Sequence, residues 1–174
     1  MRVAFVDDPA LAGPLRDIVN TAYDEGEAGL WLPGHERVSL AALAGCIARG
    51  ELAAAYEGDR VVGCVRVLPG ELGLLAAARG ATGRGVGRAL VAFAEKTARE
   101  RGARAMRLEL LVPRDGMHPA KERLHAWYSR LGYRAVGREE FAVAYPDVAP
   151  RLTVACDLVT YEKPLGDLGG LPAG

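Results

Sequence analysis

The sequence predicts one α/β domain, an α+β mixed sheet that is mostly antiparallel, with about seven strands and about four helices on its faces. Its 174 residues suit a single domain. Half of them are hydrophobic and a quarter are charged, which is usual for a globular chain. Segments whose apolar residues have the period of a strand alternate along the chain with segments that have the period of a helix. We expect the domain to span residues 1–164, with a flexible Gly/Pro-rich tail over 165–174.

The first quarter of the chain predicts one strand and two helices. Residues 1–6 alternate as a strand, and residues 9–23 place apolar side chains at helical spacing. A loop rich in glycine and acidic residues is expected over 24–37. Residues 39–50 then predict a second helix, because a serine stands at its start and a glycine at its end.

Three strands follow this helix. Residues 51–56 and 60–68 are apolar runs joined by Glu-Gly-Asp at 57–59, which is a hairpin signal. The Pro-Gly pair at 69–70 predicts a turn. Residues 71–78 then form a short apolar strand.

The second half alternates helices with strands. A glycine-rich turn opens a helix over 83–102, and residues 105–112 alternate as a strand. Residues 121–131 place aromatic and leucine side chains on one helical face before a glycine. Residues 133–141 and 153–162 are the last two strands.

Charge and cysteine content exclude several classes of function. Twenty-two basic and 22 acidic residues give a formal net charge of zero, so no positive field favours nucleic acid or a membrane surface. No segment predicts a membrane span or a secretory signal. The cysteines Cys46, Cys64 and Cys156 lack the spacing of a metal site or of a disulfide framework. We therefore expect a cytoplasmic protein without a metal.

The most informative segment is the glycine-rich turn, which runs Thr82-Gly83-Arg84-Gly85-Val86-Gly87-Arg88. Glycine allows positive φ angles and lets a ligand approach the backbone amides. The N-terminus of the following helix offers free N–H groups and a partial positive charge. Arg84 and Arg88 add cationic charge beside it, and Arg79 is a third candidate. A ligand with a pyrophosphate group is expected here.

Two other phosphate-binding motifs fit this turn poorly. A dinucleotide fingerprint needs glycine at the sixth position from Gly83, where the chain has Arg88. A P-loop ends in Gly-Lys-Ser/Thr, which the turn lacks. Glycines that only shape a tight loop remain an alternative.

The turn resembles the signature of the GCN-related N-acetyltransferase (GNAT) superfamily, Gln/Arg-x-x-Gly-x-Gly/Ala after the fourth strand. A second family motif, Tyr-x-x-x-Gly-Phe/Tyr at the end of a helix, is matched by Tyr128, Gly132 and Tyr133. A helix and a strand separate the two motifs, as in the family. The resemblance covers residues 9–164.

The resemblance implies a splay between the fourth and fifth strands into which coenzyme A inserts. Pantetheine would pair with the exposed backbone of Leu75, Ala76, Ala77 and Ala78, and the pyrophosphate would bind the amides of residues 83–88. Acetyl-CoA is the implied co-substrate. The same alanines also fit a tightly packed core layer.

Two positions depart from the family pattern. Thr82 replaces the family's Gln or Arg, which removes one side chain from the phosphate site. Lys121 stands where the family often has Asn, seven residues before the tyrosine.

Acetyl transfer to an amine needs a base, an oxyanion site and an acid. The family uses a tyrosine as general acid at the position of Tyr128. Backbone N–H groups near Ala76 and Ala77 are candidates for the oxyanion site. Glu71, five residues before Ala76, is the preferred base because its spacing resembles that of the histone-acetyltransferase branch. Glu109, His118 and water remain alternatives.

The acceptor is expected to be a primary amine of a small molecule or a peptide. The acidic residues Asp24, Glu25 and Glu27 would attract a cationic amine, and Trp31 would stack on it. A solvated acidic loop is the alternative interpretation. The resemblance also suggests a homodimer.

The sequence therefore predicts an acetyl-CoA-dependent N-acetyltransferase that works by direct transfer in a ternary complex. A catalytically silent acyl-CoA-binding module, used for sensing or regulation, is the alternative, and the departure at Thr82 favours it. A nucleotide-binding oxidoreductase is a third hypothesis, which the pattern of glycines disfavours.

Overall fold

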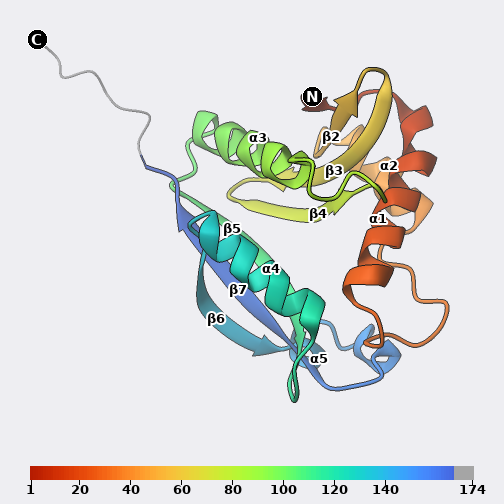
Figure 1. Cartoon of the computed structure of the whole chain (residues 1–174), viewed down its shortest axis with the longest axis vertical. Coiled ribbons are helices and arrows are strands. Elements are labelled where there is room, and N and C mark those ends of the chain that lie inside the picture. The colour runs from red at the N-terminus through yellow and green to blue at the C-terminus, as the bar shows by residue number, and fades with distance from the viewer. Residues whose placement is uncertain (167–174) are drawn as a thin grey trace, which may run out of the picture.

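A computed structural model describes residues 1–166 and contains one seven-stranded sheet in the order β1-β2-β3-β4-β5-β7-β6 (Figure 1). Neighbouring strands are antiparallel except β4 and β5, which are parallel. The predicted mixed, mostly antiparallel sheet is therefore confirmed. The strands are β1 (Arg2–Phe5), β2 (Leu52–Glu57), β3 (Arg60–Leu68), β4 (Glu71–Ala77), β5 (Ala105–Pro113), β6 (Arg134–Glu140) and β7 (Cys156–Pro164).

The four predicted helices are present, and a fifth, one-turn helix follows β6. The helices are α1 (Ala12–Gly26), α2 (Leu40–Ala48), α3 (Val86–Glu100), α4 (Pro119–Arg130) and α5 (Phe141–Ala144), with 3-10 turns at Pro9–Leu11 and Ala149–Arg151. The predicted strand over 133–141 stops before Phe141, because this ring is buried against Leu111 and Leu158 and starts α5 instead.

The helices cover the two faces of the sheet. Side chains from α3 and α4 share one buried cluster with β5 and β7, in which Leu90, Met106 and Tyr133 are almost fully buried. Side chains from α1 and α2 form a second cluster on the other face, centred on Leu15 and Leu43. Burying apolar surface stabilises a fold by about 25 cal/mol per Å² removed from water. The two clusters therefore stabilise the sheet on which the site is built.

Two boundaries differ from the sequence prediction for tertiary reasons. Helix α1 continues through residues 24–26, which the sequence assigned to a loop, and the backbone N–H of Glu27 closes it on the carbonyl of Tyr23 at 2.8 Å. The last strand starts at Cys156 rather than at Thr153, because the Thr153 N–H donates to the carbonyl of Leu30 at 2.9 Å.

The C-terminal boundary of the folded part lies beyond β7. Leu165, the first residue of the predicted tail, is buried, and its N–H donates to the carbonyl of Arg104 at 2.9 Å. Most of the predicted tail, residues 167–174, lies outside the described residues. Among residues 1–166, no helix has both the length and the apolar character needed to cross a membrane.

Candidate active site

Strands β4 and β5 separate soon after they begin. Glu71 pairs with Arg107, whose N–H donates to the carbonyl of Gly70 at 2.8 Å. In the part of the chain that the structure describes, no later residue of β4 pairs with β5. The two halves of the sheet diverge from this point, as Figure 1 shows. The splay that the resemblance implies is present.

A β-bulge bends β4 where the separation starts. Two residues of β4, Leu74 and Leu75, lie opposite the single residue Val65 of β3. Leu74 has φ of +48°, a conformation that costs energy in a residue with a side chain. A bulge increases local bending and twist, so this strained residue turns the end of β4 away from β5.

The bulge leaves one edge of β4 with free backbone groups. The N–H of Ala78 donates to the carbonyl of Val62 on β3 at 2.8 Å. Hydrogen bonds alternate sides along an antiparallel ladder, so the N–H and C=O of Ala77 point away from β3, into the gap. Ala76 pairs opposite Cys64 and bonds toward β3 by the same alternation. Of the two predicted oxyanion donors, the Ala77 N–H thus has the suitable direction.

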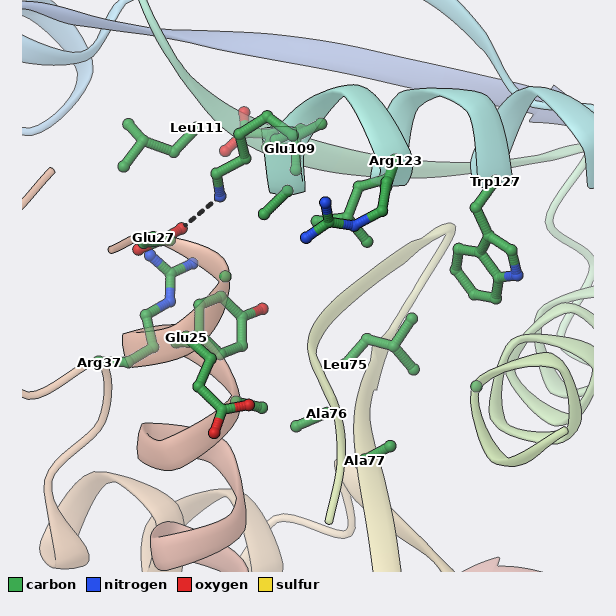
Figure 2. A pocket seen from close by; sticks show the side chains of 18 of the residues that line it. Glu25, Glu27, Arg37, Leu75, Ala76, Ala77, Glu109, Leu111, Arg123 and Trp127 are labelled. Atoms are coloured by element: carbon green, nitrogen blue, oxygen red, sulfur yellow. Dashed lines mark hydrogen bonds and ion pairs between the residues drawn. The ribbon is translucent and has the colours of Figure 1, made fainter. Parts of the chain in front are cut away.

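The gap opens into a cavity of about 830 Å³ (Figure 2). In this view Leu75, Ala76 and Ala77 line one side, Glu27 and Arg37 stand opposite, and Arg123 and Trp127 descend from α4. Residues from α1, β4, β5, α4 and α5 all contribute to its wall. A cavity of this size suits an extended cofactor together with a second small molecule.

A second hollow of about 400 Å³ lies over the glycine turn. Gly83 and Gly85 have φ of +79° and +86°, and a Cβ atom built on either would meet nothing within 4 Å. Gly85 is the N-cap of α3, whose first turn lacks acidic residues. An open backbone and a positive helix end are features that suit phosphate groups.

Trp127 joins the two hollows. It lines both, and a Cβ atom added to Gly87 would lie 3.3 Å from its ring. The glycine at this position therefore lets α4 approach the start of α3. The two hollows form a continuous path from the glycine turn to the end of β4.

The arginines near the turn differ in their partners. Arg79 is paired with Glu25, and Arg84 is paired with Glu57 at 3.0 Å. Arg88 lines the smaller hollow, and no ion pair holds it within the described residues. Arg88 is thus the arginine best placed to meet a bound phosphate.

Tyr128 lies in the wall of the larger cavity and is 6% exposed. Its ring packs against those of Trp127, Tyr133 and Tyr161. No hydrogen bond within residues 1–166 engages its hydroxyl. Burial, with smaller contributions from the nearby Tyr23 and Tyr161, raises the pKa of Tyr128 well above its usual value. The phenol is therefore neutral at physiological pH and can donate a proton.

The two candidate bases lie in different places. Glu71 is exposed at the closed end of the splay and does not line the cavity. Glu109 lies two residues beyond Arg107 on the same face of β5 and does line it. Burial by the surrounding walls, followed by the charges of Glu71 and Glu139, raises the pKa of Glu109. Glu109 is therefore the carboxylate that combines access to the cavity with a shifted pKa.

A buried ion pair closes one side of the cavity. The Lys121 Nζ lies 2.9 Å from the Glu27 Oε1, and both side chains are 4% exposed. The Glu27 Oε2 accepts a hydrogen bond from the Trp31 Nε1 at 2.6 Å. The Trp31 ring stacks on His35 with centroids 3.8 Å apart. This network, Lys121–Glu27–Trp31–His35, ties α4 to the end of α1 and orders the loop that follows.

The remaining predicted residues differ in whether they line the cavity. Asp24 is exposed and does not line it, whereas Glu25 does. His118 precedes α4, and its Nε2 contacts the carbonyl of Ala28 at 3.0 Å. Within the described residues, no group of three or more His, Cys, Asp or Glu side chains is arranged to hold a metal ion.

Several residues that line the cavity are not indicated by any sequence motif. Tyr23, Arg37 and Tyr145 line the cavity, and the Arg37 guanidinium lies 4.6 Å from the centre of the Tyr23 ring. They come from α1, the loop before α2, and the loop after α5, so no local motif groups them. Their membership in the site follows from the tertiary fold alone.

Residues 48–135 match the protein family described as "Acetyltransferase (GNAT) domain". The match covers both sequence motifs up to Tyr133, the whole of β4 and the whole of α4. No curated protein has a sequence that matches the chain significantly.

Solved structures with the same fold include acetyltransferases of different substrates. A ribosomal-protein-alanine N-acetyltransferase from Brucella melitensis is 20% identical with a TM-score of 0.69, covering 94% of this chain and 99% of its own. An aminoglycoside 6'-N-acetyltransferase complexed with coenzyme A is 19% identical with a TM-score of 0.71, covering 98% and 100%. A protein from Salmonella typhimurium, solved with its cofactor acetyl-CoA, is 16% identical with a TM-score of 0.67, covering 100% and 99%.

Proposed function

The chain belongs to the GNAT acetyltransferase family, and we propose that it transfers the acetyl group of acetyl-CoA to a primary amine by direct transfer in a ternary complex. One observation carries the proposal. The unpaired edge of β4 at Leu75–Ala77 faces a cavity that continues to the glycine turn. An extended pantetheine can add to that edge as a strand, with its diphosphate at the start of α3. Structures of the same fold that were solved with coenzyme A and with acetyl-CoA support this.

The side chains along the path fit this ligand. Ala76 and Ala77 present only methyl groups beside the β4 edge, and the open space around Gly83 and Gly85 leaves the backbone accessible. Arg88 supplies a positive charge to the diphosphate end. Thr82 lines both hollows, so a hydroxyl takes the place of the longer side chain of the family pattern.

The reaction follows from groups that face the cavity. Glu109 removes a proton from the acceptor ammonium, which is not nucleophilic while protonated. The amine nitrogen then attacks the thioester carbonyl carbon, and the Ala77 N–H stabilises the resulting oxyanion. The carbon–sulfur bond breaks, and Tyr128 donates its proton to the departing sulfur of coenzyme A. The attacking nitrogen loses its second proton to solvent, and a solvent proton returns the Tyr128 phenolate to a phenol. The amide product and the free thiol then leave.

The experiment that tests this proposal measures thiol release from acetyl-CoA with a panel of amines that contains amino acids, peptides, polyamines and aminoglycosides. At least one amine should accelerate thiol release above the rate of hydrolysis, with equimolar acetylated product in mass spectra. Binding of acetyl-CoA without any acceleration would instead favour the silent acyl-CoA-binding module.

Replacing Glu109 separates the two candidate bases. We expect Glu109→Gln to lower kcat/KM about 100-fold at neutral pH, which is the lower end of the usual contribution of a general base. Because the pKa of Glu109 is raised, the wild-type rate should fall on the acidic side at a pH above that of an ordinary glutamate. The variant should lose this limb and recover activity at high pH, where the amine deprotonates by itself.

Glu71→Gln is the matched control for the base. This variant removes the same charge from the same face of the sheet but leaves the cavity wall intact. We expect its kcat/KM to stay within about threefold of the wild type. If kcat/KM falls further in Glu71→Gln than in Glu109→Gln, Glu71 is the base.

Replacing Arg88 tests the diphosphate end. We expect Arg88→Met to raise the Kd of acetyl-CoA about 10-fold, in line with the loss of one charge-assisted hydrogen bond. Arg84→Met is the control and should have a smaller effect, because Arg84 is already paired with Glu57. Calorimetry with S-acetyl-pantetheine, which has no diphosphate, should show equal affinity for all three proteins. Unequal affinities for this shorter ligand would contradict the assignment.

A further inference from the structure

We infer that the acceptor carries a carboxylate as well as the amine, and that it is a free amino acid with an apolar side chain whose carboxylate is bound by Arg37. The inference rests on the proposed function, because it names the acceptor class of the same site.

Arg37 is a cation that faces the cavity without an anionic partner. It lines the cavity, and Figure 2 shows its side chain beside Glu27, across from the end of β4. The carboxylate of Glu27, however, forms its ion pair with Lys121 and accepts a hydrogen bond from Trp31. No ion pair within residues 1–166 includes Arg37. Its guanidinium rests over the Tyr23 ring at 4.6 Å, so one face of the guanidinium is covered. A planar N–H edge binds a carboxylate through two hydrogen bonds.

The Tyr23 ring connects this cation to the reaction centre. Tyr23 and Tyr128 both line the cavity, and Tyr23 contributes to the raised pKa of Tyr128, after burial. Arg37, Tyr23 and Tyr128 thus line the same cavity, which suits a small acceptor that reaches both the guanidinium and the proposed acid.

The carboxylates of the cavity wall argue against a polycationic acceptor. Three of the lining residues are acidic, namely Glu25, Glu27 and Glu109. Glu25 is paired with Arg79 and Glu27 with Lys121. Within the described residues, Glu109 alone of the three has no ion-pair partner. The site thus offers one carboxylate for one amine.

The wall around these two charges is apolar. Trp31 meets Phe141 edge to face with centroids 5.6 Å apart, and Trp31 is held in place by its hydrogen bond to Glu27. Leu111 and Leu158 line the cavity beside them. A preformed apolar wall with few polar groups is suited to an apolar side chain.

Three further arginines line the cavity. Arg79 is paired with Glu25, whereas Arg123 and Arg130 come from α4. Figure 2 shows Arg123 on the helix that also carries Trp127, the residue that borders the glycine turn. They therefore share the wall assigned to coenzyme A. Arg37 belongs to the opposite wall, with the end of α1.

Matched acceptors test the inference. Initial rates of thiol release at saturating acetyl-CoA are compared for L-phenylalanine, L-phenylalanine amide and phenethylamine, with L-leucine and L-methionine as further amino acids. We expect kcat/KM for the best amino acid to exceed that for its carboxylate-free counterpart at least about 10-fold. Arg37→Met should lower kcat/KM for the amino acid about 10- to 100-fold, mainly through KM. Its rate with phenethylamine should change less than about threefold, because this amine makes no ion pair.

Two control variants locate the effect. Glu36→Gln changes the exposed neighbour of Arg37 on the same loop and should leave the preference for carboxylates unchanged. Arg123→Met removes a positive charge from the other wall and should also preserve that preference. If Arg123→Met abolishes the preference while Arg37→Met preserves it, the assignment to Arg37 is overturned.

The remaining outcomes separate this inference from the function on which it rests. Acetylation of an aminoglycoside, a polyamine or phenethylamine in preference to every amino acid would overturn the acceptor class and leave the acetyltransferase intact. If the protein binds acetyl-CoA but acetylates none of the amino acids, the proposed acceptor class is overturned as well. Failure to bind acetyl-CoA at all would overturn both.

Discussion

Replacing Tyr128 with phenylalanine is expected to lower kcat about 100- to 10,000-fold, the range that general acid catalysis usually contributes. The phenol, which its raised pKa keeps protonated before the reaction, donates a proton to the departing thiolate as the carbon–sulfur bond breaks. The ring contacts with Trp127 and Tyr133 remain in the variant. We therefore expect the Kd of acetyl-CoA to change less than about twofold, because no ground-state contact is lost.

Stopped-flow or steady-state thiol release gives kcat, and calorimetry gives the Kd of acetyl-CoA. Tyr161→Phe is the matched control, since Tyr161 is a neighbouring tyrosine whose hydroxyl is engaged by His125 at 2.7 Å. Its kcat should stay near the wild-type value. Undiminished turnover in Tyr128→Phe would remove the hydroxyl from the mechanism.

The second large effect concerns stability. Lys121→Met leaves the Glu27 carboxylate buried with Trp31 as its partner. Removing one member of a buried ion pair usually costs about 3–5 kcal/mol, because the other charge stays desolvated. We expect the free energy of unfolding to fall by about this amount, measured from the midpoint and slope of urea denaturation.

A double variant shows whether the cost arises from the unpaired charge. Glu27→Gln combined with Lys121→Met removes both charges and keeps an acceptor for the Trp31 Nε1. It should regain more than half of the lost stability, since replacing a whole buried pair is often close to neutral. Equal destabilisation of the single and the double variant would mean that packing around Lys121, rather than charge, stabilises this wall.

Much of the fold follows from local patterns in the sequence. The period of apolar residues gave the strands and the long helices, because each element buries one face against the sheet. Gly83, Gly85 and Gly87 at the start of α3 predicted a phosphate site from backbone chemistry, and Gly83 and Gly85 have the positive φ angles expected of glycine in such a turn. Tyr128 was found through the motif that ends at Tyr133, and the structure places its side chain in the cavity wall.

What the sequence did not predict depends on contacts between distant residues. Lys121 and Glu27 are 94 positions apart, so neither residue alone predicts a buried pair. Three acidic residues near the end of α1 looked alike in the sequence, yet Asp24 is exposed, Glu25 lines the cavity in a pair with Arg79, and Glu27 is buried. Their different environments arise only when Arg79, which follows β4, and Lys121 of α4 reach the end of α1.

The bulge in β4 was also hidden from sequence analysis. Leu74 takes a positive φ of +48°, whereas a positive φ is usually anticipated at glycine. Gly73 stands immediately before it, so the local sequence points to the wrong residue. Pairing of β4 with β3 on both sides of Leu74 imposes the strained conformation, and this information lies in the sheet.

Isothermal titration with acetyl-CoA tests the central claim most directly, namely that the open edge of β4 and the glycine turn together bind this thioester. We predict one site per chain, a Kd in the micromolar range typical of enzyme substrates, and a weaker response to S-acetyl-pantetheine. No heat is expected from NAD at the same concentrations. Absence of binding at millimolar acetyl-CoA, or tighter binding of NAD, would contradict the account.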